Sequence, residues 1–244
     1  LKEASVRALK AGTDMDMVSC GFLNTLEESL KEGKIMEDQI NTACRRVLEA
    51  KYKLGLFSNP YKYGDTLRVK EQLYTAEHRS AARAIASETF VLLKNENHLL
   101  PLGLKGKIAL VGPMADARNN MCGMWSMACT ASRHGTLLEG IRSAAGDKAE
   151  ILYAKGSNVY EDAEMEKAAA GIRPLEHEDS RKLLDEALRV ASRADVIVAA
   201  LGECAEMSGE SASRTNLEIP DAQQNLLKAL LKTGKPVVLL LFTG

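Results

Sequence analysis

The sequence has 244 residues, enough for one large or two small domains, and its 45% hydrophobic and 27% charged residues are typical of a folded protein, which excludes intrinsic disorder. The formal net charge of −1 gives no support to electrostatic capture of nucleic acid or of an anionic membrane. No apolar run approaches the roughly 20 residues of a membrane span, since the longest, 236–242, has the length of a strand.

Helical patterns dominate residues 1–57. Residues 1–12 have helical spacing and end at Gly12, and 13–18 is short enough for a strand or strand end. Thr25 is expected to cap a helix, with Glu28 completing a capping box.

A further helix is expected within 35–56. Apolar residues recur there at mostly three-to-four spacing and predict one buried stripe. Its members are Ile40, Cys44, Val47, Leu48, Tyr52 and Leu54.

Periodicity stops at 58–65, a turn-rich stretch typical of a domain boundary, and we place a linker over 58–75. An alanine-rich helix is expected over 75–89, followed by a brief apolar run at 90–94.

Helices and strands then alternate. Strands are expected at 107–111, 196–201 and 236–241, and helices at about 136–145, 178–193 and 221–233. This alternation predicts crossover connections and a doubly wound, mainly parallel α/β sheet, whose functional loops lie beyond the carboxyl ends of the strands. Because the sequence starts as if in mid-helix and stops in a central-type strand, we expect a piece of a longer protein.

The loop from Gly202 to Arg214 has the composition most suited to catalysis. It follows a strand of the buried type and carries Glu203, Glu206 and Glu210 together with serines and glycines. A carboxyl at a mobile loop tip can enter a cleft, lose water there and act as a general acid or base. Glu210 is the best candidate, although a solvated loop with Arg214 paired to a glutamate has the same composition.

Two other stretches hold candidate binding residues. Trp125, the only tryptophan, lies in the glycine-containing loop 112–127, where an exposed ring can stack on a sugar or the side chain can pack inward. Asp14 and Asp16 share one side of the expected strand end, where they can hold hydroxyls or orient backbone.

Other kinds of site find little support. Gly112-Pro113 lacks the spacing of a phosphate-binding loop, and the dispersed histidines accompany no nucleophile-elbow motif. The five cysteines are odd in number and lack CxxC or Cys/His metal spacing, so we expect neither a disulfide framework nor a zinc site. They are Cys20, Cys44, Cys122, Cys129 and Cys204.

Five motifs occur in order along the chain. They are Ala-Gly-Thr-Asp-Met-Asp-Met at 11–17, Glu-Thr-Phe-Val-Leu-Leu-Lys-Asn-Glu at 88–96 with Leu-Leu-Pro-Leu at 99–102, Val-Gly-Pro at 111–113, Trp125-Ser126, and Gly202-Glu203 through Ser-Gly-Glu-Ser-Ala-Ser-Arg at 208–214. Together these motifs resemble family 3 of the glycoside hydrolases, most closely its bacterial periplasmic β-glucosidase branch.

The resemblance implies an architecture and a set of roles. Residues 1–57 would be the last units of a (β/α)₈ barrel, 58–75 the linker, and 76–244 an α/β sandwich truncated at its C-terminus. Glu210 would be the acid/base of a retaining enzyme, with Glu203 the second choice, and Trp125, Arg214, Asp14 and Asp16 would border the sugar. The family's nucleophile lies in a Ser-Asp-Trp motif, which this sequence does not contain.

The resemblance also implies a substrate and a setting. The parent protein would hydrolyse terminal non-reducing β-D-glucosyl residues of β-glucosides or short β-linked oligosaccharides, without a cofactor or metal, in the periplasm or outside the cell. This chain alone is expected to be inactive, with no nucleic-acid or membrane partner, and to self-associate through uncovered barrel and sheet surfaces. The alternatives are a stand-alone carbohydrate-binding or scaffold module and, by fold analogy alone, a nucleotide-binding domain.

Overall fold

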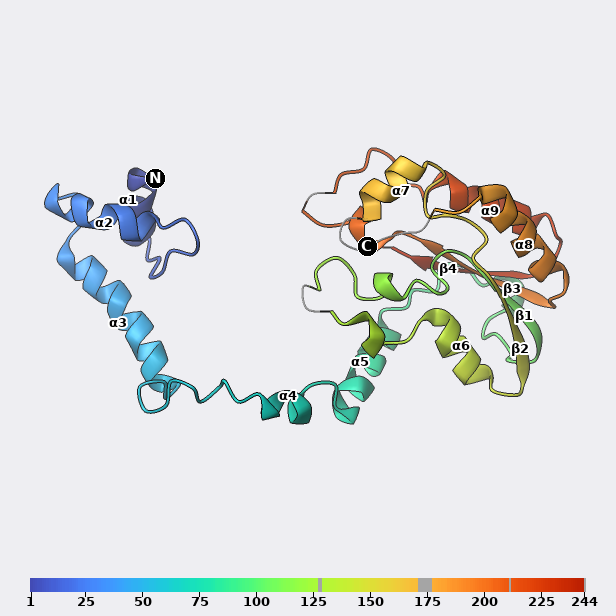
Figure 1. The fold of residues 1–244 in the computed structure, drawn as a ribbon, viewed down its shortest axis with the longest axis horizontal. Coiled ribbons are helices and arrows are strands. Elements are labelled where there is room, and N and C mark those ends of the chain that lie inside the picture. The colour runs from blue at the N-terminus through green and yellow to red at the C-terminus, as the bar shows by residue number, and fades with distance from the viewer. Residues whose placement is uncertain (127–128, 171–176, 211, 244) are drawn as a thin grey trace. The chain divides into compact units, whose positions relative to one another are not determined.

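The computed structural model describes residues 1–126, 129–170, 177–210 and 212–243 (Figure 1). The chain divides into two compact units, Leu1–Val91 and Leu92–Gly244, and each is described by itself.

The regular secondary structure of the first unit consists of helices joined by loops. It contains α1 (Lys2–Lys10), α2 (Gly21–Lys31), α3 (Glu37–Lys53), α4 (Leu67–Gln72) and α5 (Ala76–Glu88). A small apolar core joins the first three helices and consists of Val6, Leu9, Leu26, Ile35 and Ala43. The Thr75 hydroxyl caps α5 by accepting a hydrogen bond from the His78 backbone N–H at 3.1 Å.

Two expectations for this unit are wrong. Residues 13–18 form no strand, because no other strand is present within 1–91 to pair with them. Thr25 is not a helix cap, since α2 begins at Gly21 and the Thr25 hydroxyl donates to the Gly21 carbonyl at 2.7 Å. The Asp16 carboxylate accepts from the Phe22 backbone N–H at 3.1 Å and so serves the helix start.

The expected buried stripe of α3 is also wrong. Leu48, Tyr52 and Leu54 are exposed, and Ala43 is the buried residue of that helix. The spacing predicted the helix correctly. Burial additionally requires an element packed on the apolar face, and the core that α3 shares with α1 and α2 includes Ile40 and Ala43 but not Leu48 or Tyr52.

The second unit is a parallel α/β domain. Strands β1 (Gly106–Val111), β2 (Ala149–Ala154), β3 (Val196–Gly202) and β4 (Val237–Phe242) form a sheet in the order β2-β1-β3-β4. Every neighbouring pair is parallel, with Ile108 opposite both Ile151 and Val196. The α-helices are α6 (Leu137–Ala145), α7 (Ala163–Ala170), α8 (Ser180–Ser192) and α9 (Asp221–Leu231), and the short 3₁₀ helices are η1 (Glu96–His98), η2 (Arg118–Asn120), η3 (Ala131–Arg133) and η4 (Ala205–Met207).

Strand alternation divides the core of this unit between the two faces of the sheet. Ile108 and Leu110 of β1 face the cluster that includes Leu138 of α6. Ala109 and Val111 face the opposite cluster, which holds α8 and α9 through side chains such as Leu226. Figure 1 shows α6 on one side of the sheet and α8 with α9 on the other. This confirms the predicted doubly wound α/β fold, although β2 and α7 were not predicted.

No helix among the described residues combines the length and the apolarity that crossing a bilayer would need.

Candidate active site

The carboxyl ends of the two central strands open into the loops that carry the candidate residues. At the end of β3, Gly202 has φ +142°, and a Cβ atom there would lie 2.0 Å from the Phe242 carbonyl oxygen of β4. Only glycine can therefore occupy this point, where the chain leaves the sheet. Glu203 follows directly, so the end of strand β3 determines where its backbone lies.

The loops after β1 and β3 are bound to each other. The Asn120 side chain accepts a hydrogen bond from the Ala205 backbone N–H and donates to the Glu203 carbonyl at 3.4 Å. Farther along, a Cβ atom at Gly209 would lie 2.8 Å from Met124 Cγ, so the two loops touch at these residues. Trp125 follows Met124 and Glu210 follows Gly209 in the sequence. The two candidate residues therefore lie on adjoining loops.

The two glutamates of the β3 loop differ in surroundings. Glu203 forms an ion pair with Arg214, and both side chains are largely buried, at 19% and 22% exposure. Arg214 also donates to the Glu218 carbonyl, which fixes the guanidinium. Glu210, in contrast, is exposed. Ser211, which follows it, lies outside the described residues.

Trp125 is 67% exposed and does not pack inward. Its loop is closed by a disulfide between Cys122 and Cys129, so the expectation of no disulfide was wrong for this pair. The bridge could not be inferred from the sequence, because the cysteine total is odd and the other three cysteines are free. Met127, at the end of the predicted loop, is outside the described part of the chain.

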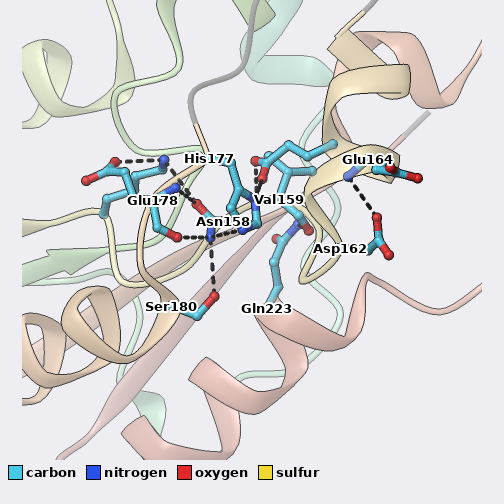
Figure 2. Close-up of polar contacts among 10 residues, drawn as sticks. Asn158, Val159, Asp162, Glu164, His177, Glu178, Ser180 and Gln223 are labelled. Carbon is cyan, nitrogen blue, oxygen red and sulfur yellow. Dashed lines mark hydrogen bonds and ion pairs between the residues drawn. The ribbon is translucent and has the colours of Figure 1, made fainter.

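A partly buried polar network lies at the same carboxyl end of the sheet (Figure 2). Glu166 of α7 is 1% exposed, and its carboxylate accepts from the Val159 backbone N–H at 3.0 Å and contacts His177 Nδ1. Asn158 accepts from the Glu178 N–H at 3.0 Å and donates to the carbonyl of Glu178 at 2.8 Å. These contacts connect the segment after β2 to the residues that precede α8.

Gln223 of α9 connects this network to the β3 loop. Its fully buried amide accepts from the Gly202 N–H and donates to the Gly202 carbonyl, each at 2.8 Å. The same amide nitrogen donates to the Val159 carbonyl at 3.3 Å. Gln223 therefore holds the residue that immediately precedes Glu203.

The two aspartates lie in the first unit. Asp14 pairs with Arg46 at 3.0 Å. Asp16 accepts from the Ser19 hydroxyl and the Phe22 N–H, and these hydrogen bonds, with Ser19 the larger influence, hold the pKa of its carboxyl below its usual range. Asp16 thus organises local backbone, whereas Asp14 forms an ion pair with a side chain of α3.

The site therefore has support that motif reasoning did not find. Asn120 and Gln223 fix the backbone of the β3 loop, yet each lies in a stretch without a recognisable signature. Each side-chain amide bonds to backbone that is distant in sequence, and no local sequence pattern predicts such a contact.

Comparison with protein families identifies residues 90–244 as a glycosyl hydrolase family 3 C-terminal domain. The periplasmic beta-glucosidase of Salmonella typhimurium is 41% identical over 252 residues, covering 99% of this chain and 32% of that protein. A beta-xylosidase of Formosa agariphila is 31% identical over 255 residues, covering 99% of the chain and 33% of its own length.

Solved structures show the same relationship. The beta-glucosidase from Listeria innocua in complex with glucose matches with a TM-score of 0.79 and 32% identity, over 99% of this chain and 30% of its own. A beta-glucosidase involved in saponin metabolism from intestinal bacteria matches with a TM-score of 0.80 and 31% identity, over 99% of this chain and 34% of its own. The chain thus spans about a third of the length of these relatives.

Proposed function

The chain belongs to glycoside hydrolase family 3, and we propose that it supplies the acid/base loop of a retaining, exo-acting β-glucosidase, with Glu210 as the acid/base. The observation that carries this proposal is the contrast within one loop. Glu203 is paired with Arg214 near the base of the loop, whereas Glu210 is exposed beyond the contact of Gly209 with Met124. A group that must reach a substrate has to be presented in this way.

In this proposal the reaction has two steps. Glu210 protonates the glycosidic oxygen as the nucleophile attacks the anomeric carbon, and it then removes a proton from the water that hydrolyses the glycosyl-enzyme intermediate. The two carboxyl groups of retaining enzymes lie about 5 Å apart, so the Glu210 loop has to face the nucleophile directly. Trp125, exposed on the adjoining loop, is placed to stack on a sugar face.

We further propose that the nucleophile belongs to a part of the protein outside these 244 residues. The sequence has no Ser-Asp-Trp motif, and it matches about a third of each relative. The domain division 1–57, 58–75 and 76–244 remains a prediction on the same basis. The periplasmic name of the Salmonella relative supports a periplasmic location for the whole protein.

The first experiment compares the isolated chain with a chimera. The chain alone, incubated with p-nitrophenyl β-glucoside, is expected to release no nitrophenol, because deleting a covalent nucleophile removes most of the catalytic rate. The chimera replaces the matching third of the Salmonella relative with residues 1–244 and is expected to be active. Hydrolysis by the isolated chain at the rate of the relative would overturn the assignment of the nucleophile.

The acid/base assignment is tested in the same chimera. Glu210→Ala should lower kcat/KM on cellobiose by roughly 10²- to 10⁴-fold, the usual contribution of general acid–base catalysis. Azide should restore turnover of p-nitrophenyl β-glucoside and yield β-glucosyl azide, because azide needs no general base. Glu203→Ala is the matched control from the same loop and should give no azide product. Azide rescue of Glu203→Ala alone would transfer the role to Glu203.

The sugar preference is a second measurement on the active chimera. Relatives named as beta-glucosidase and as beta-xylosidase both cover the chain at similar identity. We propose the β-glucoside as the preferred substrate, given the higher identity to the Salmonella protein. A higher kcat/KM for p-nitrophenyl β-xyloside than for the β-glucoside would contradict this choice.

One observation favours sugar binding by the chain itself as a second candidate function. Trp125 is the only tryptophan and is largely exposed, so its fluorescence reports contact with a sugar. Saturable quenching by cellobiose, absent in Trp125→Ala, would support a carbohydrate-binding module. Unchanged fluorescence would leave the acid/base loop as the function.

Self-association is proposed for the isolated chain. Leu48, Tyr52 and Phe57 of the first unit are exposed and line an open apolar hollow of about 470 Å³. Sedimentation velocity should show species larger than a monomer, and Leu48→Glu should reduce them. A concentration-independent monomer would contradict the proposal.

A further inference from the structure

The loop that carries Trp125 brings together a set of soft metal ligands. Cys122, Cys129 and His134 each offer a donor atom, and these atoms all lie within 4.8 Å of one another. All three side chains are partly buried, so the cluster is accessible from solvent without being fully hydrated. None of these residues takes part in the proposed glycosidase chemistry.

The Cys122 sulfur and the His134 ring lie at nearly the spacing of a tetrahedral thiolate and imidazole site. Cys122 Sγ lies 3.5 Å from His134 Nε2 and 3.9 Å from Nδ1. Zinc bonds of about 2.3 Å to sulfur and about 2.0 Å to nitrogen, at a tetrahedral angle, place the two donor atoms about 3.5 Å apart. Rotation of the His134 ring can bring Nδ1 from 3.9 Å to about 3.5 Å from Cys122 Sγ, and reduction of the disulfide lets the two sulfur atoms move apart to admit a metal ion.

The imidazole is oriented by its surroundings. His134 Nε2 lies 3.3 Å from the Arg118 carbonyl oxygen, and donation to that oxygen leaves the Nδ1 lone pair for a metal. The Arg118 guanidinium in turn donates to the His134 carbonyl and pairs with Glu139. Glu139 belongs to the capping box of α6 with Thr136, which fixes this support to the domain.

We propose that Cys122, Cys129 and His134 form a redox-gated site for a soft divalent metal ion, with Zn²⁺ as the natural occupant. In the disulfide both sulfurs are bonded to each other and neither is available as a thiolate ligand. A dithiol reductant transfers two electrons and two protons to the bridge and becomes a disulfide itself. The metal then displaces the two thiol protons and binds two thiolates and one imidazole.

Three protein ligands leave one position of a tetrahedron for water or another small ligand. Trp125 lies between the two cysteines in the sequence, so both the disulfide and the metal close the loop that bears it. The disulfide-closed loop opens on reduction, whereas the metal-closed loop forms only after reduction. Metal binding should therefore change Trp125 fluorescence only in the reduced protein.

The test uses Co²⁺ as a spectroscopic substitute for Zn²⁺ on the 244-residue chain. Cys20→Ser and Cys44→Ser are introduced first, since these free thiols are exposed and would bind cobalt adventitiously. The phosphine-reduced protein is titrated under argon, and an equal sample with the Cys122–Cys129 bridge intact serves as a control without any further substitution. Thiol counting with a disulfide reagent verifies each state.

Reduced protein is expected to bind one equivalent of Co²⁺, with thiolate charge-transfer and tetrahedral d–d absorption that one equivalent of Zn²⁺ abolishes. Cys129→Ser and His134→Ala should each weaken binding more than about 100-fold, beyond the range seen when a supporting group is lost. Far-UV circular dichroism verifies that both variants remain folded. The bridged control should show no such absorption.

Absence of these bands in the reduced protein would overturn the site. Their persistence in the bridged control, or in Cys129→Ser, would do the same. The readout is absorption by the chain itself, so its failure is independent of the glycosidase proposal.

Discussion

Gln223 offers the sharpest test of how the β3 loop is held. Its buried amide makes three hydrogen bonds to backbone groups, two to Gly202 and one to Val159. Gln223→Met keeps nearly the same volume and removes all three. Each net hydrogen bond stabilises a protein by roughly 0.5–1.5 kcal/mol, and a buried backbone group left unpaired costs about 1–3 kcal/mol. We therefore expect a loss of about 3–5 kcal/mol, a large share of the stability of a domain.

Urea unfolding followed by Trp125 fluorescence measures this loss, because the only tryptophan lies in the second unit. The midpoint should fall while the slope with denaturant concentration stays constant. Hydrogen exchange should also show that the Gly202 N–H loses protection, since its partner is removed.

The matched control is Gln224→Met, one residue along α9. The Gln224 amide bonds to Glu218 and Ile219 and is only half-buried, so water can replace its contacts. We expect less than about 1 kcal/mol there. An equal loss in both variants, or a loss below about 1 kcal/mol for Gln223→Met, would refute the view that this buried amide anchors the loop.

Two further substitutions and one reactivity test follow from local geometry. Gly209→Ala should destabilise the second unit by about 1–3 kcal/mol in the same urea experiment, because φ is +114° and the added Cβ would meet Met124. Gly140→Ala, in helix α6 with open space around it, should instead stabilise by about 0.5–1 kcal/mol, and the same sign for both would contradict this. Burial raises the pKa of the Cys204 thiol to about 11, so iodoacetamide at about pH 9 should modify exposed Cys44 and spare Cys204, with peptide mass spectrometry as the readout. Equal labelling of the two would be inconsistent with the burial of Cys204.

The sheet was predictable where a strand contains a continuous apolar run. β3, β4 and the last four residues of β1 are continuous apolar runs, the pattern typical of a parallel sheet covered by helices. β2 was missed because its apolar run is short, with a glutamate at the second position of Ala149–Ala154, and because only Ala154 is fully buried. Its existence depends on in-register pairing with β1, which periodicity alone does not contain.

Burial of helix faces was predicted less well than the helices themselves. The three-to-four spacing in 35–56 correctly gave α3, since local spacing determines which residues share a face. Whether that face is covered depends on other elements, and Leu48 and Tyr52 are exposed here. The predicted start of α2 was wrong for a related reason. Asp16, which lies outside the helix, accepts from the Phe22 N–H at its first turn, whereas the Thr25 hydroxyl donates to a carbonyl within the helix.

The composition of the β3 loop was predictable from sequence, but the different surroundings of its two candidate glutamates were not. Sequence places Glu203 and Glu210 seven positions apart in one polar loop and favours Glu210, but it does not show which of the two is paired with Arg214. Moving Glu203 away from Arg214 is energetically unfavourable, because it would leave a partly buried guanidinium without its partner. An acid/base group must release and accept a proton next to a substrate, which a carboxylate engaged in such a pair can do only by breaking it. In the proposed enzyme, therefore, Glu203 with Arg214 stiffens the base of the loop, and this stiffness is what allows exposed Glu210 to be presented at a reproducible position.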